Sequence, residues 1–322
     1  MASSLAERLK GSGRVFVVAV AGDSGSGKTT LSRGIRRLLG EEAVSTFSMD
    51  DYHSLDREER RVRGMTPLNP EANRLDLLAE HLRSLRLGET IAKPVYDHSV
   101  GEFREPVPFR SGPVLILEGL HPLYTQKLRR EVDFGIFVDP SRAVKRRWKI
   151  RRDCGDRGYQ RDLVMAEILA REPDYKLYVD VQKVYAEAVV KIDDTRLGAP
   201  SFLEDPGERY SVRLIQEVLE AGPSAVDLKI DLSALFSLPD GEFSISFQRD
   251  DYYGKRVSVL TVDGELHRSM VEGVEAKLKS LAGSTAPICD RAGGDRVTST
   301  GMAQLLLSWR LLEKLQLHLD KA

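Results

Sequence analysis

The feature that most constrains this chain is the run Gly22–Thr29, GDSGSGKT, which matches the pattern G-x-x-x-x-G-K-[ST] in full. It follows a β-branched apolar run, Val15–Ala21, which predicts a strand buried on both faces. It precedes Thr29–Leu39, whose helical periodicity ends at Gly40. A strand, a glycine-rich turn and a helix in this order are the context that a phosphate-binding loop requires.

The residue types in this loop suit a triphosphate. Glycines let backbone N–H groups point at phosphate oxygens, and the helix N-terminus adds its positive end. Lys28 can reach the outer phosphates, and the Thr29 hydroxyl can ligate Mg²⁺. The motif alone leaves ATPase, GTPase, kinase and motor open. The expected nucleotide-binding residues of the loop are Gly22, Asp23, Ser24, Gly25, Ser26, Gly27, Lys28, Thr29 and Thr30.

Three more apolar runs end in polar residues and are interpreted as buried strands. They span residues 43–49, 113–117 and 134–138. Because these strands alternate with helical segments, we expect an α/β fold with a doubly wound, mostly parallel sheet and helices on both faces. In such sheets, ligands bind at the carboxyl ends of the strands.

The length of 322 residues suggests about two domains, and the chain changes character near residue 195. Residues 1–195 hold the predicted sheet, an excursion at 50–112 that we expect to bind substrate, and a basic segment at 141–171 of two helices around a turn at 156–159. Residues 196–322 are predicted to form a smaller α+β region. Its candidate elements are strand- or helix-like runs at 211–219, 225–230, 243–247 and 257–262, a loop at 283–301, and an amphipathic helix at 302–319 that packs in the core or at a dimer face.

Acidic residues follow two of the predicted strands. Asp50 and Asp51 come after the second strand, and Glu118 follows the third. A carboxylate at this edge can take a proton from an acceptor hydroxyl, and a second one can orient Mg²⁺ and its waters. His53 and Arg57 stand just downstream, where an acceptor could bind, although such residues are also common in ordinary loops.

The segment Ser141–Arg161 is strongly basic, with nine Lys and Arg residues against two Asp. Lys145, Lys149 and Arg152 recur on one helix face. Such a cluster can be a solvated face, a nucleic-acid patch, or a clamp for a transferring phosphoryl group or a phosphorylated acceptor. Aromatic residues are sparse in this segment, which disfavours a nucleic-acid platform.

Composition narrows the class of protein. A formal net charge of −1, with 41% hydrophobic and 30% charged residues, argues against a protein that mainly coats nucleic acid or an anionic membrane. The two cysteines, Cys154 and Cys289, exclude a disulfide framework and fit a reducing compartment. No apolar run is long enough to span a bilayer. We therefore expect a cytoplasmic protein with neither nucleic acid nor a membrane as partner.

Taken together, these residues resemble the phosphoribulokinases, within the wider phosphoribulokinase and uridine kinase family of P-loop kinases. The stretches DDYHSLDR (50–57) and EGLHP (118–122) are more specific than the phosphate loop. VSVLTVDGE (257–265) resembles the carboxyl-terminal part of the plant and cyanobacterial-type enzymes, so the resemblance covers most of the chain. The other matching stretches are PEANRLDLL (70–78), KPVYDH (93–98), KIRRD with RG (149–158) and REPDYKLYVDVQK (171–183).

The resemblance implies the P-loop kinase fold and a reaction. The γ-phosphoryl group of MgATP would pass to the 1-hydroxyl of D-ribulose 5-phosphate, giving ribulose 1,5-bisphosphate and ADP. Asp50 would be the general base, Glu118 with Thr29 would serve Mg²⁺, and Arg157 would close over the nucleotide. The implied catalytic set is Asp50, Lys28, Glu118 and Lys149, and the implied substrate-binding set is His53, Arg57, Tyr96, His98, His121, Lys149 and Arg152.

The chain departs from the plant-type enzymes at one place. Those enzymes carry a cysteine inside the phosphate loop and another soon after it, whereas here Ser26 occupies the loop and no cysteine precedes Cys154. We therefore expect no disulfide switch of that kind. The resemblance also implies a homodimer, and it associates the product with carbon fixation, although other pathways stay open.

Two other functions stay open. A uridine or other nucleoside kinase would share the phosphate loop, Asp50 and the lid. A phosphorylated acceptor needs more cationic partners than a neutral nucleoside, and His53, Arg57 and the basic segment favour the phosphorylated one. A nucleotide-sensing scaffold would need no base, so Asp50 and Glu118 argue against it.

Overall fold

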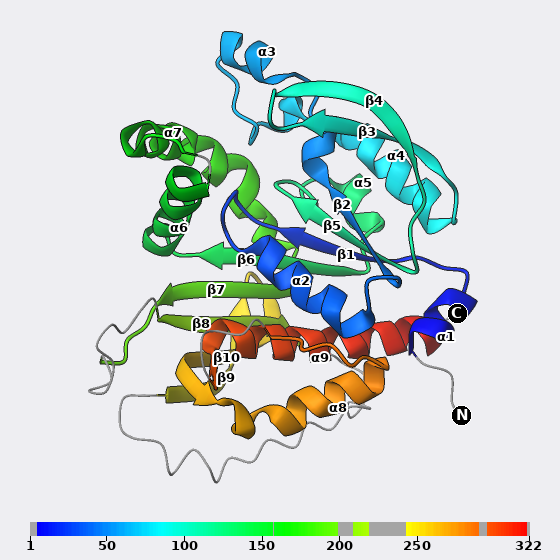
Figure 1. Ribbon diagram of the computed structural model, residues 1–322, viewed down its shortest axis with the longest axis vertical. Helices are drawn as coiled ribbons and strands as arrows, with labels where there is room; N and C mark the ends of the chain where they lie inside the picture. Colours follow the sequence, from blue (N-terminus) through cyan, green and yellow to red (C-terminus); the bar gives the residue numbers. More distant parts are fainter. Residues whose placement is uncertain (1–4, 157, 199–208, 219–242, 290–294, 321–322) are drawn as a thin grey trace.

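The computed structural model describes residues 5–156, 158–198, 209–218, 243–289 and 295–320, and a sheet of nine strands runs through this part of the chain (Figure 1). The strand order is β11-β10-β8-β7-β6-β1-β5-β2, with β9 paired to β10. The strands are β1 (Phe16–Ala21), β2 (Val44–Ser48), β5 (Val114–Gly119), β6 (Phe134–Pro140), β7 (Ala188–Asp194), β8 (Tyr210–Glu217), β9 (Phe243–Tyr252), β10 (Lys255–His267) and β11 (Arg296–Thr298).

Five neighbouring strands, β2, β5, β1, β6 and β7, pair in parallel. The strands from β8 onward pair antiparallel. The phosphate loop lies at the carboxyl end of β1, in the middle of the parallel part. The predicted α/β fold with its parallel sheet is confirmed, and the four predicted strands correspond to β1, β2, β5 and β6.

Helices cover both faces of the sheet. Successive residues of β1 point to opposite faces, so each set packs against different helices. Val18 and Val20 pack in a core with α1, α2, α8 and α9, whereas Val17 packs with α4 and α5 on the other face. The helices are α1 (Leu5–Gly11), α2 (Lys28–Leu39), α3 (Arg57–Val62), α4 (Leu75–Arg86), α5 (Gln126–Arg130), α6 (Arg142–Ile150), α7 (Arg161–Asp174), α8 (Glu272–Ala282) and α9 (Ser299–Asp320). Short helical turns are η1 (Met49–Tyr52), η2 (Pro70–Ala72), η3 (Arg151–Asp156), η4 (Tyr175–Val179), η5 (Asp180–Val184) and η7 (Arg268–Met270). No helix within the described ranges is long and apolar enough to cross a membrane.

The excursion at 50–112 contains a hairpin that periodicity did not indicate. Strands β3 (Ile91–Asp97) and β4 (Glu102–Phe109) form a separate antiparallel sheet beside α4 (Figure 1). Proline and charged residues break the alternation that normally marks a strand, and β4 is mostly exposed. The hairpin carries Tyr96 and His98 toward the phosphate loop.

The segment after residue 195 continues the main sheet. The boundary expected at 195–196 falls between β7 and β8, which pair directly with each other. Predicted runs at 243–247 and 257–262 lie within β9 and β10, the run at 211–219 overlaps β8, and the run at 225–230 lies outside the described residues. The predicted loop at 283–301 is wrong at its end, because β11 forms there. This strand has three residues, too few for a periodic pattern in the sequence, and it is defined by its backbone pairing with β10.

The terminal helix α9 is a core element. It begins at Ser299, three residues before the predicted start, and it packs against α2, α8 and β8. Leu305, Leu311 and Leu315 are fully buried. The sequence left open whether this helix packs in the core or at a dimer face. Its buried side chains lie in the core of the chain.

Replacing Leu311 by alanine is expected to lower the free energy of unfolding by about 2–5 kcal/mol, because a fully buried leucine leaves a cavity. Urea unfolding followed by circular dichroism measures the loss. The control is Leu281→Ala on α8, where the side chain is 38% exposed and the change should stay within about 0.5 kcal/mol. Equal stabilities of the two variants would contradict the core position of α9.

Candidate active site

The phosphate loop is held in shape by glycines. Gly27 has φ 94°, in the left-handed region, directly before α2. At Gly22 an added Cβ would lie 2.7 Å from the carbonyl oxygen of Val138, so no side chain fits between the loop and β6. The loop therefore stays close to the sheet and leaves backbone N–H groups at the start of α2, where the helix end favours an anion.

Lys28 is partly buried within this loop. Its ammonium donates hydrogen bonds to the carbonyl oxygens of Gly22 at 2.9 Å and Asp23 at 2.7 Å. Burial lowers the pKa of Lys28, and the nearby carboxylates, Asp23 first among them, oppose that shift. The cation is thus positioned at the mouth of an anion-binding loop, among acidic groups that favour its charged form.

Thr29 and Glu118 meet at the start of α2. The Thr29 hydroxyl donates to Glu118 Oε1 at 2.9 Å. Both groups offer hard oxygen ligands, which Mg²⁺ prefers, and Mg²⁺ commonly binds through one or two protein groups plus phosphates and water. This pair therefore fits the ion. Within the described ranges, no group of three or more His, Cys, Asp or Glu side chains could hold a metal.

A cleft of about 540 Å³ opens between the phosphate loop and the excursion. It brings together most of the predicted site residues, namely Ser24 to Thr30, Asp50, His53, Arg57, Tyr96, His98, Glu118 and Arg152. It also includes residues that the sequence analysis did not assign to the site, among them Ser48, Arg60, Trp148 and Arg171. Arg171 opens the stretch REPDYKLYVDVQK, so the resemblance carried a signal for it.

Aromatic and cationic groups form the wall of the cleft opposite the loop. The ring of Tyr96 lies edge-on to His53 and to His98, at 5.0 Å between centroids in each case. Arg60, only 7% exposed, donates to the Tyr96 hydroxyl at 2.9 Å. His98 Nε2 lies 3.5 Å from Asp50 Oδ2, which places the predicted base at the junction of this wall with the sheet.

His53 is held as a buried neutral group. Its Nδ1 lies 3.0 Å from Asn73 Oδ1, and its side chain is almost fully enclosed. Burial, and then the charge of Arg60, lower the pKa of His53 to about 4. At neutral pH the His53 imidazole is therefore uncharged, and it can act in the site as a hydrogen-bonding group but not as a cation.

Four predicted residues of the described ranges do not line the cleft: Gly22 and Asp23 at the start of the phosphate loop, His121 and Lys149. His121 is 1% exposed, and its Nε2 donates to the carbonyl oxygen of Leu68 at 2.8 Å, so it ties two loops together. Lys149 Nζ pairs with Glu167 Oε1 at 3.1 Å in the neighbouring cation cluster. The predicted nucleotide residue Arg157 lies outside the described residues.

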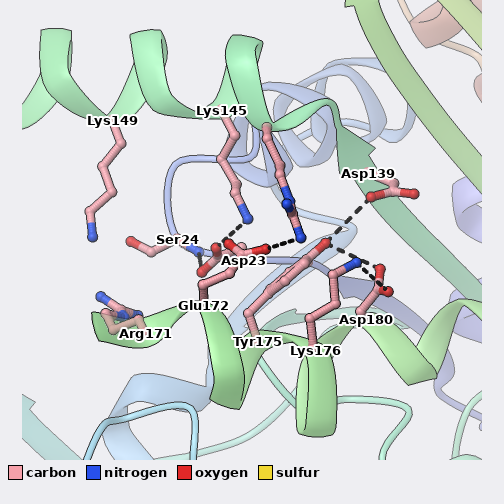
Figure 2. Close-up of polar contacts among 12 residues, drawn as sticks. Asp23, Ser24, Asp139, Lys145, Lys149, Arg171, Glu172, Tyr175, Lys176 and Asp180 are labelled. Carbon is pink, nitrogen blue, oxygen red and sulfur yellow. Dashed lines mark hydrogen bonds and ion pairs between the residues drawn. The ribbon is translucent and has the colours of Figure 1, made fainter. Parts of the chain in front are cut away.

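The basic helix α6 faces the phosphate loop (Figure 2). Lys145 pairs with Asp23 at 2.8 Å and lies 3.6 Å from the centre of the Tyr175 ring, and Arg152 donates to Ser24 Oγ at 3.2 Å. Burial would raise the pKa of Asp23, but Lys145 and Arg171 outweigh it and lower the pKa. The cations thus hold an ionised carboxylate inside the loop. Lys145 and Lys149 are 7% and 5% exposed, so this part of the basic segment is not a solvated face, and its use as a phosphoryl clamp stays a prediction.

Known proteins resemble this chain over most of its length. The model of the Phosphoribulokinase / Uridine kinase family matches residues 17–197, just over half of the chain. A phosphoribulokinase of Synechocystis sp. is 38% identical over 262 residues, covering 78% of this chain and 77% of that protein. A chloroplastic phosphoribulokinase of Mesembryanthemum crystallinum is 34% identical over 300 residues, covering 85% and 75%. The solved structure of a phosphoribulokinase from Rhodobacter spheroides has a TM-score of 0.55 at 18% identity, covering 94% of this chain and 99% of that one, which shows a shared fold.

The buried histidines give a testable titration. His53 and His121 each have a pKa of about 4, against 6.5 for an open imidazole, because burial disfavours the charged form. The unfolded chain therefore binds more protons between pH 6.5 and 4, and these groups reduce folding stability as the pH falls through that window. We expect both imidazoles to stay neutral at pH 5.5 in an NMR titration, with resonances assigned from His53→Asn and His121→Asn. A midpoint near pH 6.5 for either would contradict the observed burial.

Proposed function

This chain belongs to the phosphoribulokinase / uridine kinase family, and on that premise we propose that it is a phosphoribulokinase. It transfers the γ-phosphoryl group of ATP to the 1-hydroxyl of D-ribulose 5-phosphate, giving ribulose 1,5-bisphosphate and ADP. The observation that carries the proposal is a single cleft in which a phosphate loop faces a wall of arginine, histidine and tyrosine, with Asp50 between the two. The similarity to phosphoribulokinases also extends beyond residue 197, the last residue that the family model matches.

Asp50 is the proposed general base. It lies after β2 in the short turn η1. Its backbone N–H donates to Ser48 Oγ, which caps the turn and holds the backbone of Asp50 in place. The carboxylate faces the same cleft as Lys28 and Glu118. In this position it can accept the proton of an acceptor hydroxyl while that oxygen attacks the terminal phosphorus.

Positioning and charge supply the rest of the proposed catalysis. Lys28 and the backbone N–H groups of the loop bind the outer phosphates, and Arg152, which donates to Ser24 Oγ of the loop, lines the same cleft. Thr29 and Glu118 would hold Mg²⁺, which neutralises phosphate charge when bound. Lys149 stays in the proposed catalytic set because its Cβ lies against the loop, 3.6 Å from where a Cβ on Gly25 would be. His121 is proposed to position the loop that contains Leu68, whose carbonyl oxygen accepts its hydrogen bond.

The acceptor side distinguishes the main proposal from a nucleoside kinase. A sugar phosphate brings a dianion that charged donors bind far better than neutral ones do. Arg57 and Arg60 line the acceptor half of the cleft, and Arg57 donates to the carbonyl oxygen of His98. A neutral nucleoside would leave these guanidinium groups without an anionic partner.

Three further points stay proposals. Two copies of the chain are proposed to pair, and sedimentation analysis tests this. A reducing cytoplasm is proposed as the location, which is consistent with neither Cys154 nor Cys289 forming a disulfide. Carbon fixation is proposed to use the product. The phosphate loop has Ser26 where the plant-type enzymes have a cysteine, so its activity should not depend on a disulfide at that position.

Turnover measured as ADP release with MgATP should require ribulose 5-phosphate and should not occur with uridine or without acceptor. Asp50→Asn should lower this turnover at least about a hundredfold, because general-base catalysis typically raises the rate roughly 10²–10⁴-fold. It should leave MgADP binding unchanged. The control is Asp76→Asn, an exposed carboxylate paired with Lys127 away from the cleft. Turnover with uridine would favour the nucleoside kinase, and nucleotide binding without ADP release under any sugar or nucleoside acceptor would favour the scaffold.

Arg57→Ala should raise the KM for ribulose 5-phosphate about tenfold or more and leave the KM for ATP unchanged, because a charged hydrogen bond to a phosphate contributes about 1.5–3 kcal/mol. Steady-state kinetics with each substrate varied in turn provide the measurement. Arg61→Ala is the matched control on the same helix, since Arg61 pairs with Glu58 at the surface and does not line the cleft. An unchanged acceptor KM would remove Arg57 from the acceptor site.

A further inference from the structure

Two adjacent carboxylates, Asp50 and Asp51, follow β2, and the proposed reaction uses only Asp50. The Asp50 side chain is 43% exposed and lines the active-site cleft. The Asp51 side chain is only 16% exposed and does not line the cleft. A carboxylate that is so largely removed from water needs partners within the protein for its oxygens. The partners of Asp51 therefore indicate what this second acidic residue does.

Both oxygens of Asp51 are bound by one strand, β3. Oδ1 accepts the backbone N–H of Tyr96 at 3.0 Å. Oδ2 forms an ion pair with the ammonium of Lys93, whose side chain is also 16% exposed. Lys93 donates in addition to the carbonyl oxygen of Pro94 at 3.2 Å, so its ammonium is held between the strand and the carboxylate. One side chain of η1 thus holds two points of β3.

The ladder between β3 and β4 is irregular between these two points. Lys93 pairs with Val107, and Val95 pairs with Arg104, so β4 contributes two residues between these pairs where β3 contributes only Pro94. Proline has no backbone N–H to donate to a neighbouring strand. A bulge of this kind disrupts the local pairing and bends the strand. The half of the hairpin beyond the bulge therefore depends on contacts outside its own ladder for its direction.

That half of the hairpin carries Tyr96 and His98, which line the cleft. Its tip is also held by Arg57, whose backbone N–H donates to the carbonyl oxygen of Gly101 at 3.0 Å and whose guanidinium donates to that of His98. In the proposed mechanism the same guanidinium binds the acceptor, so acceptor binding draws on this contact. The contacts of Asp51 lie outside the cleft and do not compete with a substrate.

We propose that Asp51 is a positioning residue for the acceptor: it bridges the bulge and sets the direction in which the hairpin presents Tyr96 and His98. The inference rests on the proposed function, since it takes the acceptor to lie against these side chains. Asp50 and Asp51 share the four-residue turn η1, so the same turn aligns the proposed base and the wall of the cleft that faces it. The two adjacent carboxylates therefore have different roles, one in the reaction and one in holding the hairpin.

The first test is hydrogen exchange of the full-length protein without substrate, followed by mass spectrometry. Asp51→Ala removes both contacts and should speed amide exchange in residues 95–101 at least about fivefold, with exchange in residues 22–30 unchanged. The matched control is Arg104→Met, which breaks an ion pair with Asp97 on the same hairpin. Because Arg104 is 53% exposed, exchange in residues 95–101 should then stay within about twofold of the wild-type rate. Unchanged exchange in Asp51→Ala would overturn the bridge.

The second test is steady-state kinetics with ribulose 5-phosphate and MgATP varied in turn. Asp51→Ala should raise the acceptor KM at least about fivefold and leave the KM for MgATP unchanged. Lys93→Met removes the ion pair and keeps the hydrogen bond to Tyr96, so it should change the acceptor KM in the same direction by a smaller factor. The double variant should be no worse than Asp51→Ala alone, because both changes act through one contact.

Two kinetic results would overturn the positioning role. One is an acceptor KM that stays unchanged in Asp51→Ala while the hairpin exchanges faster. The other is an equal rise of both KM values, which would indicate a general loss of structure. A wild-type protein that does not phosphorylate ribulose 5-phosphate would overturn the proposed function alone, because the exchange measurement needs no acceptor.

Discussion

The parallel pairing of β1 with β5 is the constraint on which the site depends. The register places Val20 opposite Glu118 and Ala21 opposite Gly119, so the two strands end at the same level. The phosphate loop leaves one of these strands, and the acidic residue stands at the end of the other. A shift of one residue would turn Glu118 to the opposite face of the sheet and separate it from the Thr29 hydroxyl.

Helix α6 and the turn after it form the second support of the loop. Lys145, Trp148 and Arg152 follow one another at three- to four-residue spacing, and each contacts a different residue of the loop. This spacing puts them on one helical face. On this face Lys145 neutralises Asp23, Trp148 packs on Gly27 and Arg152 binds Ser24. The helix is therefore not simply a solvated surface, although it carries many cations.

The sequence was informative where a motif is local. The phosphate loop, the parallel strands around it and the residues Asp50, His53 and Arg57 follow from short patterns with fixed spacing, and all three residues line the cleft. Arg60 was missed because it stands on a short helix whose sequence, REERRV, is typical of a solvated surface. Its burial comes from packing against Tyr96, a residue more than thirty positions away.

By itself, the sequence determined the phosphate loop, the α/β class and the acidic edge of the sheet, because hydrophobic period and loop chemistry are encoded within a few neighbouring residues. Only the tertiary structure decided that β8 and β10 extend the main sheet, that His121 is enclosed, and that α9 packs beside α2. Each of these depends on contacts between residues far apart in the chain, whose strength is set by packing and burial and leaves no periodic trace in either segment.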